Sequence, residues 1–562
     1  MDGLPEKHSP SRLGRAIPLL LLAAFAVQAT TAALEDSVTI DEYFHVPYGV
    51  HLLDTGDITP DLMNPPLGKA LLALPLVLWP DAFTSIRGAP PGGKAWAFHQ
   101  ANRDRYQAVI LACRGMVILA ALALGVLVFA WASRLYGSRA GTLALVLFAF
   151  SADLLGQGHL ATLDLPGTLF FTLTCWAAWR LLDRPGFRAA TLLGVSLGVA
   201  VLTKLSCVVL IPVVLLTLVA GAIRERRVGR WLAYAALAGG VALLVLNLGY
   251  GFAGTGTSLA ALQLAPNGPL AALAQRIPDL PLPVPAALIQ GLDLATTSGA
   301  TSEPTYFLAG ELSAKGWWYY HLAAFGLKTS LPLLVLGIAS IGLAFRRRDG
   351  GGRAFGTACL FAPVAALFLA ASLTGALQIG VRHVLAAVPL LIIPAAGIAA
   401  FVLDRALAGA GPPARRWGPA ILVAALLTWH VAGTVAVGPR YLQFFNEIAG
   451  GPEGGHRYLV DSNLECGQDL IRLKDYLDEH GIAEVPLAYF GRVDPAIYGI
   501  RAVPLDRNTH GIAVVSPTFV AGRPYFGNLD AQHGWLPAGT FAWLRDHPPI
   551  DRVGALFVVR LP

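Results

Sequence analysis

Apolar runs alternate with short polar loops along most of the chain. Many of these runs approach the roughly 20 residues that a helix needs to cross a membrane. The pattern predicts a polytopic α-helical membrane protein with about eleven transmembrane helices, at residues 16–34, 109–131, 140–156, 165–182, 188–203, 205–223, 231–250, 318–345, 355–373, 383–403 and 419–437. The first run could be a secretory signal, but it is long enough to span, and we interpret it as an uncleaved helix.

Two stretches depart from this pattern. Leu67 to Trp79 is apolar but too short to span, and it contains Pro75, which predicts an interfacial helix. After residue 438 charges become frequent, and strand-like runs (VPLAYF, AVVS, ALFVV) alternate with helical patterns. We therefore predict a transmembrane domain at residues 1–437, with outer loops at 35–108 and 251–317, and a small C-terminal extracytoplasmic α/β domain at residues 438–562.

The basic residues fall in every second loop, which is how positive charge marks the cytoplasmic side of a membrane protein. The pattern predicts a cytoplasmic N-terminus, and an odd number of helices puts residues 438–562 outside. Only Lys204 separates the helices at 188–203 and 205–223, and merging them would move later basic loops outside, so we keep both. The loop residues are Lys7, Arg12, Arg15, Arg134, Arg139, Arg184, Arg188, Arg224, Arg226, Arg227, Arg230, Arg346, Arg347, Arg348, Arg353, Arg405, Arg415 and Arg416.

Composition supports the membrane assignment. Charged residues make up 14% of the chain and hydrophobic residues 55%, whereas charged residues are about 25% of an ordinary soluble protein. The formal net charge of +6 has a topological cause, so we predict no nucleic-acid partner. The five cysteines show no metal-binding spacing, and we predict neither a disulfide nor a zinc site.

Acidic residues beside the first and fourth predicted helices are the first candidates for chemistry. Asp41 and Glu42 are adjacent, and His45 follows Asp41 by one helical turn, which offers a base and a proton relay. Asp164 lies five residues after His159 in a loop on the same predicted side. Asp41 and Asp164 could together hold Mg²⁺ or Mn²⁺. Alternatively, either acid could only cap a helix, and Glu42 could orient an acceptor, bind a cation or simply face solvent.

Basic residues on the same predicted side could bind a phosphate group. Lys69, Arg382 and His383 are the preferred set, with Lys204 and Lys328 as further candidates. The planar fork of Arg382 suits bidentate phosphate binding. For Lys328 the alternative is a side chain that reaches out of the membrane to the polar boundary.

Several motifs resemble a known family. They are Asp41-Glu42 after the first helix, NPPLGK, HLATLDLP, LTK at Lys204, KGWWYY, and VRH at Arg382-His383. Together they resemble polyprenyl-phosphate-sugar-dependent membrane glycosyltransferases of the GT-C class, a group that includes protein O-mannosyltransferases and aminoarabinose transferases of lipid A. The resemblance implies the GT-C fold, a location in the inner (cytoplasmic) membrane, and a catalytic position for Asp41.

The C-terminal motif YLQFFNEIAGGPEGGHRYLVDSNLECGQDL resembles that of bacterial members whose substrate is unassigned. In such a motif we expect DSNLDWGQDL, but here Glu465-Cys466 replaces the Asp-Trp pair. If this element contacts the acceptor, its specificity is altered.

The expected chemistry also follows from the donor. A sugar on a polyprenyl phosphate can be transferred only where the lipid head group meets water, so the site should be at the outer membrane face. The leaving phosphate needs cations, and an acceptor hydroxyl needs a carboxylate to take its proton. The sugar, hexosyl or pentosyl, and the acceptor, which could be a lipid, a glycan or a protein, stay open. So do two other classes of protein: a lipid or glycan transporter or flippase, although matched inverted halves are not evident, and a non-catalytic scaffold of an envelope-assembly complex.

Overall fold

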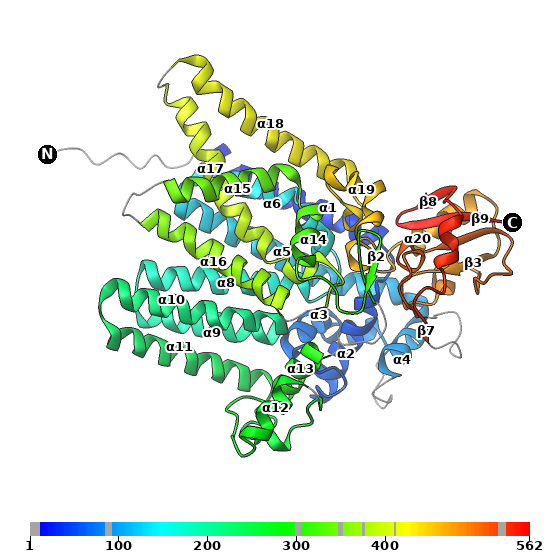
Figure 1. Cartoon of the computed structure of the whole chain (residues 1–562), viewed down its shortest axis with the longest axis horizontal. Coiled ribbons are helices and arrows are strands. Elements are labelled where there is room, and N and C mark those ends of the chain that lie inside the picture. Colours follow the sequence, from blue (N-terminus) through cyan, green and yellow to red (C-terminus); the bar gives the residue numbers. More distant parts are fainter. Residues whose placement is uncertain are drawn as a thin grey trace.

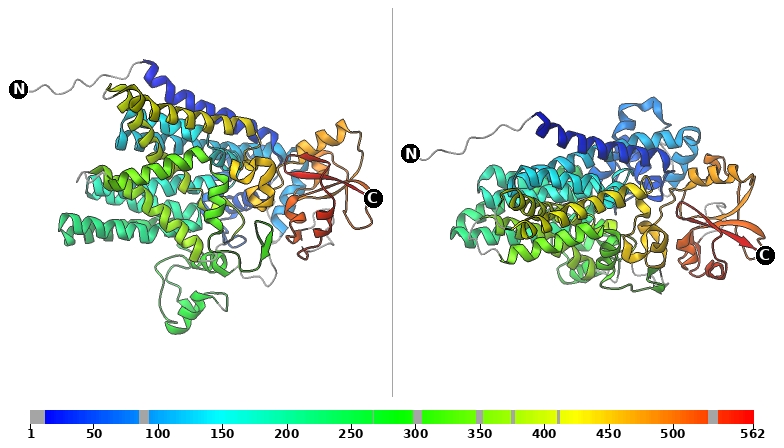
Figure 2. Two further views of the ribbon diagram at one scale, coloured as in Figure 1. Left: turned by 45° about the horizontal axis from the view of Figure 1, so that its top comes forward. Right: turned by 90° about the horizontal axis from the view of Figure 1, so that it is seen from above.

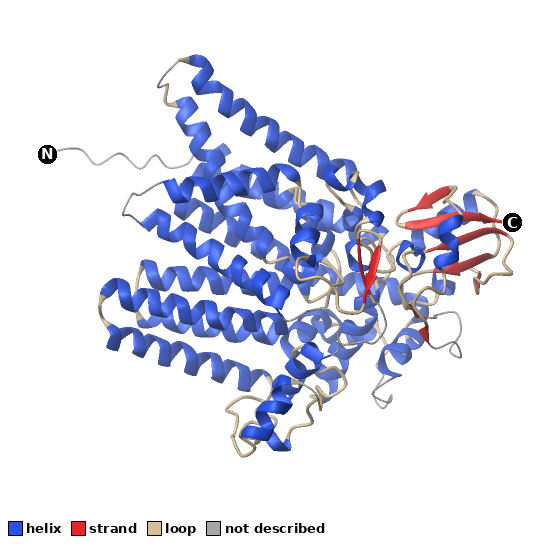
Figure 3. Cartoon of the chain, in the orientation of Figure 1, coloured by secondary structure: helices blue, strands red, loops and turns tan. Residues whose placement is uncertain are grey.

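A helical bundle with a small sheet at one end makes up the protein (Figures 1 and 3). The computed structural model describes residues 12–84, 93–266, 268–297, 305–346, 352–373, 377–409, 412–526 and 535–562. We call the end of the bundle beside the C-terminal sheet the domain end, and the opposite end the loop end. Seen from above, the sheet lies beyond the ends of the helices and not along their flank (Figure 2).

The predicted apolar segments all lie on helices of the described part of the chain. Six of these helices are long and apolar enough to cross a membrane, or up to eight if each bent pair is one span. The exact number of spans therefore stays a prediction, while the multi-pass helical fold is confirmed. The helices are α1 (Arg12–Glu35), α5 (Tyr106–Tyr136), α6 (Ser138–Ala149), α7 (Ala152–Gly158), α8 (Asp164–Asp183), α9 (Phe187–Thr203), α10 (Leu210–Glu225), α11 (Val228–Gly249), α14 (Tyr320–Lys328), α15 (Leu331–Arg346), α16 (Gly352–Leu373), α17 (Ala387–Leu407) and α18 (Pro413–Val437).

Two segments predicted as straight helices are broken. α6 and α7 meet at 61°, and α14 and α15 meet at 116°. The second break precedes Pro332, which lies in the first turn of α15, where the N–H that proline lacks would have no partner within the helix. The bends matter for the site, because each places charged residues such as Lys328 at the domain end.

The chain reverses direction at Lys204, between α9 and the 3₁₀ helix η4 (Leu205–Val209). α9, α10 and α11 lie side by side (Figure 1). α9 and α11 pack closely because α9 presents glycine: a Cβ added at Gly194 would lie 2.5 Å from the carbonyl oxygen of Ala238. The predicted hairpin is thus present, and it leaves Lys204 at the domain end.

The described basic loop residues gather at the loop end, as the alternating pattern predicts. Arg134 lies 3.4 Å from Asp183, and Arg139 forms an ion pair with Asp404. Lys7, Arg347 and Arg348 lie outside the described residues. Which side of the membrane the loop end faces stays a prediction.

Shorter elements cover the domain end. The predicted interfacial helix is α3 (Pro66–Leu78), and it packs against α2 (Ile40–Thr55), the helix that begins just before Asp41. The first predicted outer loop also contains η1 (Pro80–Ala82), α4 (Lys94–Ala101) and η3 (Arg103–Arg105). The second predicted outer loop, at 251–317, contains two α-helices and an unpredicted hairpin: η5 (Leu259–Ala261), α12 (Pro269–Arg276), α13 (Ala286–Thr297), β1 (Tyr306–Leu308) and β2 (Glu311–Ser313).

The C-terminal region contains a five-stranded sheet with strand order β4-β3-β5-β9-β8. β3 is parallel to β4 and β5, whereas β9 is antiparallel to β5 and β8. The three predicted strand-like runs are confirmed as β3, β5 and β9. The bounds are β3 (Val485–Ala488), β4 (Ala502–Val503), β5 (Gly511–Val515), β8 (Asp551–Val553) and β9 (Leu556–Leu561), with α20 (Leu470–Glu479), α21 (Pro517–Val520), β6 (Tyr525–Phe526), β7 (Trp535–Leu536) and η12 (Ala542–Asp546) around them.

A stretch of short helical turns joins α18 to the sheet. It consists of η7 (Tyr441–Gln443), η8 (Glu447–Ala449), α19 (Gly451–Gly454), η9 (Gly455–Arg457) and η10 (Asp461–Asn463). This stretch contains the motif singled out in the sequence, and it packs against the domain end of the bundle through contacts of η7 with α7 and α18 and of η10 with the turn η6 (Val381–Val384).

Candidate active site

Four charged side chains from four distant segments meet at the domain end. Asp41 lies in the first turn of α2, Asp164 begins α8, Lys204 follows α9, and Arg382 lies in η6. Arg382 Nη1 donates to Asp41 Oδ2 and lies 3.7 Å from Asp164 Oδ2. Lys204 Nζ donates to Asp164 Oδ1. We call these four residues the charge cluster.

The charge cluster is only partly exposed. The side chain of Asp41 is 21% exposed and that of Lys204 18%, against 12% for Arg382 and 7% for Asp164. Each carboxylate contacts a cation, so the cluster is neutral overall while its edge stays open to a ligand. An incoming anion would compete with Asp41 and Asp164 for the same two cations.

Three nitrogen atoms on Arg382 or on residues within one helical turn of the charge cluster in sequence are buried without a hydrogen-bond partner in the described part of the chain. They are Arg382 Nε, His383 Nε2 and His45 Nδ1. The ring of His383 lies edge-on to that of His321, with centroids 6.1 Å apart. Buried polar atoms are nearly always hydrogen-bonded in folded proteins, so these three atoms are free to bond to a polar ligand.

The predicted pairing of Asp41 with Asp164 around Mg²⁺ or Mn²⁺ does not fit this geometry. The guanidinium of Arg382 contacts both carboxylates, and Lys204 takes another oxygen of Asp164. A divalent cation there would face two positive charges, and the described residues bring no group of three His, Cys, Asp or Glu side chains together. Dependence on Mg²⁺ or Mn²⁺ stays a prediction.

Glu42 does not face solvent, and none of the three predicted alternatives for it matches its surroundings. Its carboxylate is fully buried and accepts two hydrogen bonds from Arg114, at 2.7 and 2.8 Å, and one from Ala161 N at 2.7 Å. It also closes a capping box with Thr39. Burial disfavours the charged carboxylate, but the charge of Arg114 and the hydrogen bonds from Arg114, Thr39 and Ala161 together outweigh burial, and the pKa of Glu42 is lowered. Glu42 therefore anchors the start of α2, next to Asp41.

His159 also serves structure. Its Nε2 lies 2.8 Å from Asp36 Oδ2, and its Nδ1 lies 2.6 Å from the carbonyl oxygen of Leu155. The other oxygen of Asp36 lies 2.8 Å from Arg472 Nη1. This chain of contacts joins the end of α7 to α20, across the boundary between the bundle and the C-terminal region.

Two predicted phosphate ligands have other partners among the described residues. Lys69 Nζ donates to the carbonyl oxygen of Asp61 at 2.7 Å and lies 3.5 Å from its carboxylate. Burial lowers the pKa of Lys69, although Asp61 opposes the shift. Lys328 does not reach out to the membrane boundary: it is 4% exposed, and its Nζ donates to the carbonyl oxygens of Leu442 and Asn463, at 2.8 and 2.5 Å.

Residues 461–470, which we call the tail segment, hold two of the segments that form the charge cluster. Val381 N donates to Asn463 Oδ1 at 2.9 Å, one residue before Arg382. Ile40 N donates to the carbonyl oxygen of Cys466 at 2.9 Å, one residue before Asp41. Ser37 Oγ adds a hydrogen bond to the carbonyl oxygen of Gly467 at 2.8 Å.

Sequence reasoning missed the residues that support the site. Arg114 is fully buried and donates to Glu42 and to the carbonyl oxygens of Ala33, Asp36 and Ser37. A lone arginine inside an apolar run is a detectable signal, because an unpaired charge there is costly. Asn463 carried no such signal, since a neutral amide is ordinary at any surface.

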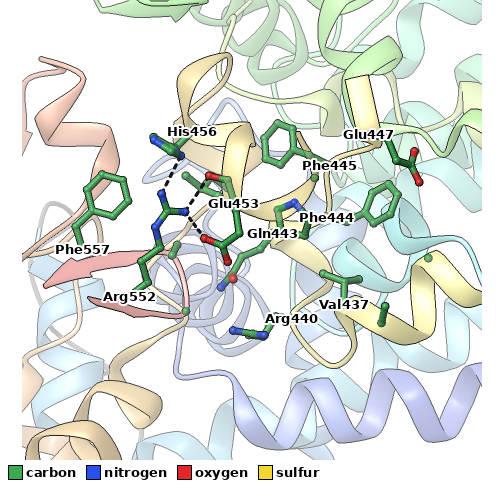
Figure 4. Close-up of a pocket in the computed structure, with 17 residues that line it drawn as sticks. Val437, Arg440, Gln443, Phe444, Phe445, Glu447, Glu453, His456, Arg552 and Phe557 are labelled. Atoms are coloured by element: carbon green, nitrogen blue, oxygen red, sulfur yellow. Dashed lines mark hydrogen bonds and ion pairs between the residues drawn. The ribbon is translucent and has the colours of Figure 1, made fainter. Parts of the chain in front are cut away.

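A separate cavity of about 340 Å³ lies where α18 ends beside the C-terminal sheet. Arg552 lies on one side of it, 2.9 Å from Glu453 and 3.4 Å from His456 Nδ1, and Phe444 and Phe445 lie on the other (Figure 4). The tail segment contributes Leu464. No predicted site residue is among its lining residues, so the charge cluster is a different feature.

Comparison with known proteins gives one match by sequence. Residues 105–250 match the family model described as dolichyl-phosphate-mannose-protein mannosyltransferase. The predicted resemblance is confirmed over that segment. The match supports a membrane glycosyltransferase of this kind, and it includes Asp164 and Lys204 of the charge cluster. No curated protein sequence matches the chain.

Two solved structures are similar to the chain in shape. ArnT from Cupriavidus metallidurans bound to undecaprenyl phosphate is 15% identical, with 98% of each chain covered and a TM-score of 0.47. The oligosaccharyltransferase AglB from Archaeoglobus fulgidus, in complex with an inhibitory peptide and a dolichol-phosphate, is 11% identical, with 89% of this chain and 62% of that chain covered and a TM-score of 0.49. Likenesses this distant carry no argument about function.

Proposed function

We propose that the protein is a membrane glycosyltransferase that moves a sugar from a polyprenyl-phosphate donor to an acceptor hydroxyl or phosphate, at the outer face of the cytoplasmic membrane. The observation that carries this proposal is the charge cluster. It joins two carboxylates to two cations at one end of a membrane bundle, where a lipid head group meets water. The family match over residues 105–250 supports the same reaction class.

In the proposed reaction Arg382 and Lys204 bind the donor phosphate. Arg382 Nε and His383 Nε2 have no hydrogen-bond partner among the described residues, and they supply further contacts to phosphate oxygen. The phosphate draws Arg382 away from Asp41 and frees the carboxylate of Asp41, while Lys204 keeps its ion pair with Asp164. Charge-assisted hydrogen bonds of this type are roughly twice as strong as neutral ones.

Asp41 is the proposed general base. The acceptor oxygen attacks the anomeric carbon of the sugar, and the bond from that carbon to the phosphate oxygen breaks. The acceptor proton passes to Asp41, and the polyprenyl phosphate leaves with the electron pair of the broken bond. Arg382 and Lys204 stabilise the charge that develops on the leaving phosphate, and Asp164 keeps Lys204 in place through their ion pair.

The test begins with a strain that lacks the gene. Mass spectrometry of its envelope glycans, glycolipids and glycoproteins should show a missing sugar, which identifies both product and acceptor. Wild-type protein should restore that product, whereas Asp41→Asn should lower it by roughly 10²–10⁴-fold, because asparagine keeps the shape but cannot take the proton.

Two matched variants sharpen this test. Asp104→Asn changes an exposed acid of the 3₁₀ helix η3 and should leave product formation unchanged. Arg382→Lys keeps the charge but loses the planar fork, and it should weaken binding of undecaprenyl phosphate by about tenfold. A wild-type product level in cells that carry Asp41→Asn would exclude Asp41 as the base, and no missing sugar in the deletion strain would favour a scaffold or a transporter.

A further inference from the structure

Arg382 owes its position to backbone contacts that come from the tail segment. Val381 N donates to Asn463 Oδ1 at 2.9 Å, and Ser462 Oγ donates to the carbonyl oxygen of Ile379 at 2.7 Å. The two bonds bracket Gly380 and fix the start of η6. The approach is close, since a Cβ added at Gly380 would lie 2.6 Å from Ser462 Oγ.

Asn463 is itself held on several sides. It is fully buried, and its Nδ2 donates to Tyr320 Oη at 3.0 Å and to the carbonyl oxygen of Val460 at 3.1 Å. Its own carbonyl oxygen accepts a hydrogen bond from Lys328 at 2.5 Å. Tyr320 and Lys328 are both on α14, so the amide of Asn463 connects this helix to η6.

The same segment fixes the chain before Asp41. Ile40 N donates to the carbonyl oxygen of Cys466 and Ser37 N to that of Gln468, both at 2.9 Å. The side chain of Cys466 is buried within electrostatic reach of both Asp41 and Arg382. Asp41 and Arg382 are 341 residues apart in sequence, yet both follow directly after a residue whose N–H is bound by this one segment.

These contacts could serve only to dock the C-terminal region, but their placement indicates that they also position the charge cluster. They end at the residues immediately before Asp41 and Arg382, and the Arg382 side chain contacts Asp41 and Asp164 through Nη1, while its Nε has no hydrogen-bond partner among the described residues. Without the bond to Val381, the backbone of η6 is free to shift. A guanidinium group of Arg382 that is shifted by about 1 Å no longer binds a phosphate through two hydrogen bonds.

We propose that Asn463 is a positioning residue for the charge cluster. Its amide holds the start of η6 so that Arg382 faces Asp41 and Asp164 and can receive the donor phosphate. The effect on phosphate binding rests on the proposed function, whereas the effect on η6 does not.

The test compares wild-type full-length protein in lipid nanodiscs with Asn463→Ala and with Asn508→Ala, an asparagine exposed on the sheet domain. Hydrogen exchange followed by mass spectrometry should show faster exchange in residues 379–384 for Asn463→Ala only. Its affinity for undecaprenyl phosphate, the probe used, should fall by about tenfold, while Asn508→Ala should match the wild type in both measurements.

Further variants separate positioning from a loss of overall stability. Ser462→Ala removes one hydroxyl and should raise exchange in the same residues to a smaller extent, even if Asn463→Ala fails to fold. In an Arg382→Gln background, Asn463→Ala should cause no further loss of affinity, because it acts through Arg382. An additive loss would indicate a general structural role and overturn the proposal.

The remaining outcomes distinguish this inference from the proposed function. Unchanged exchange in residues 379–384 of both Asn463→Ala and Ser462→Ala would overturn the positioning role, whatever the affinity of the wild type. A wild-type protein that does not bind undecaprenyl phosphate, with faster exchange in both variants, would count against the proposed donor and leave the positioning of η6 supported.

Discussion

Glu465 keeps a carboxyl group in the interior of the tail segment. It is 2% exposed, and its Oε1 accepts hydrogen bonds from Thr518 N and Thr518 Oγ1, at 3.0 and 2.5 Å. Burial raises the pKa of Glu465 to about 7, although the bonds from Thr518 oppose the shift. In the unfolded chain the same carboxyl group ionises near its ordinary pKa of 4.5.

This raised pKa predicts a pH-dependent stability. Between about pH 4.5 and pH 7 the folded protein retains a proton that the unfolded chain has lost, so the free energy of unfolding falls as the pH rises through this range. The loss is on the order of 3 kcal/mol. Glu465→Gln should abolish it, which unfolding temperatures of both proteins in detergent at pH 5 and pH 8 would show. An equal fall in the two proteins would assign the effect to another group.

Residue type and predicted membrane side were enough to predict which residues form the charge cluster. They were not enough to predict which charged residues are bonded to other groups instead. Asp41, Asp164, Lys204 and Arg382 were all candidates from the sequence, and the structure brings them together. From the sequence, Glu42, Lys69 and Lys328 looked as suitable for the site as these four. In the structure, Glu42 bonds to Arg114, Lys69 to Asp61, and Lys328 to the carbonyl oxygen of Asn463. Hydrogen-bond partners of buried charges depend on contacts between distant segments, which neither spacing nor hydropathy records.

α3 sets the distance between the two segments that carry Lys204 and Asp164. A Cβ added at Gly68 would lie 2.4 Å from the carbonyl oxygen of Thr203 and 2.8 Å from Leu163 Cδ2. Thr203 precedes Lys204, and Leu163 precedes Asp164. Only a residue without a side chain lets α3 contact both segments at this distance.

Gly68→Ala should therefore push α3 away from Lys204 and Asp164. We expect a loss of about 1–3 kcal/mol in stability, as is typical of overpacking, together with reduced formation of the product identified by mass spectrometry. The control is Gly115→Ala in α5, where an added Cβ meets nothing within 4 Å and alanine should be neutral or slightly stabilising. Equal stability of the two variants would show that α3 can move without harm.

The helices themselves were predictable because their length and apolar composition leave few alternatives in a membrane. The bends in these helices were not predicted, although Pro332 was a signal for one of them. Residues 318–345 read as one continuous helix, but the structure turns by 116° between α14 and α15, just before Pro332. Hydropathy records how apolar a segment is and says nothing of its direction.

The fold places the basic loops and the charge cluster at opposite ends of the bundle. The described basic loop residues lie at the loop end, and the C-terminal sheet lies with the charge cluster at the domain end. The positive-inside rule then predicts that the domain end faces outward.

A reporter that is active only in the periplasm tests this orientation. Fused after Pro562, it should be active, and fused to a chain cut after Gly409, at the loop end, it should be silent. The reverse pattern would place the charge cluster on the cytoplasmic side, where the proposed acceptors of the outer face are absent.

The tail segment is synthesised after the two segments that it holds, so the parts of the site form in a fixed order. Asp41 and Arg382 are 341 residues apart, and at roughly 5–20 residues per second a ribosome needs roughly 17–70 s to make the chain between them. Asn463 and Cys466 emerge later still. Until they do, the N–H groups of Ile40 and Val381 lack their acceptors, so a nascent or stalled chain can be inserted in the membrane without a finished site. We therefore expect the charge cluster to reach its final arrangement only after residues 461–470 have been synthesised.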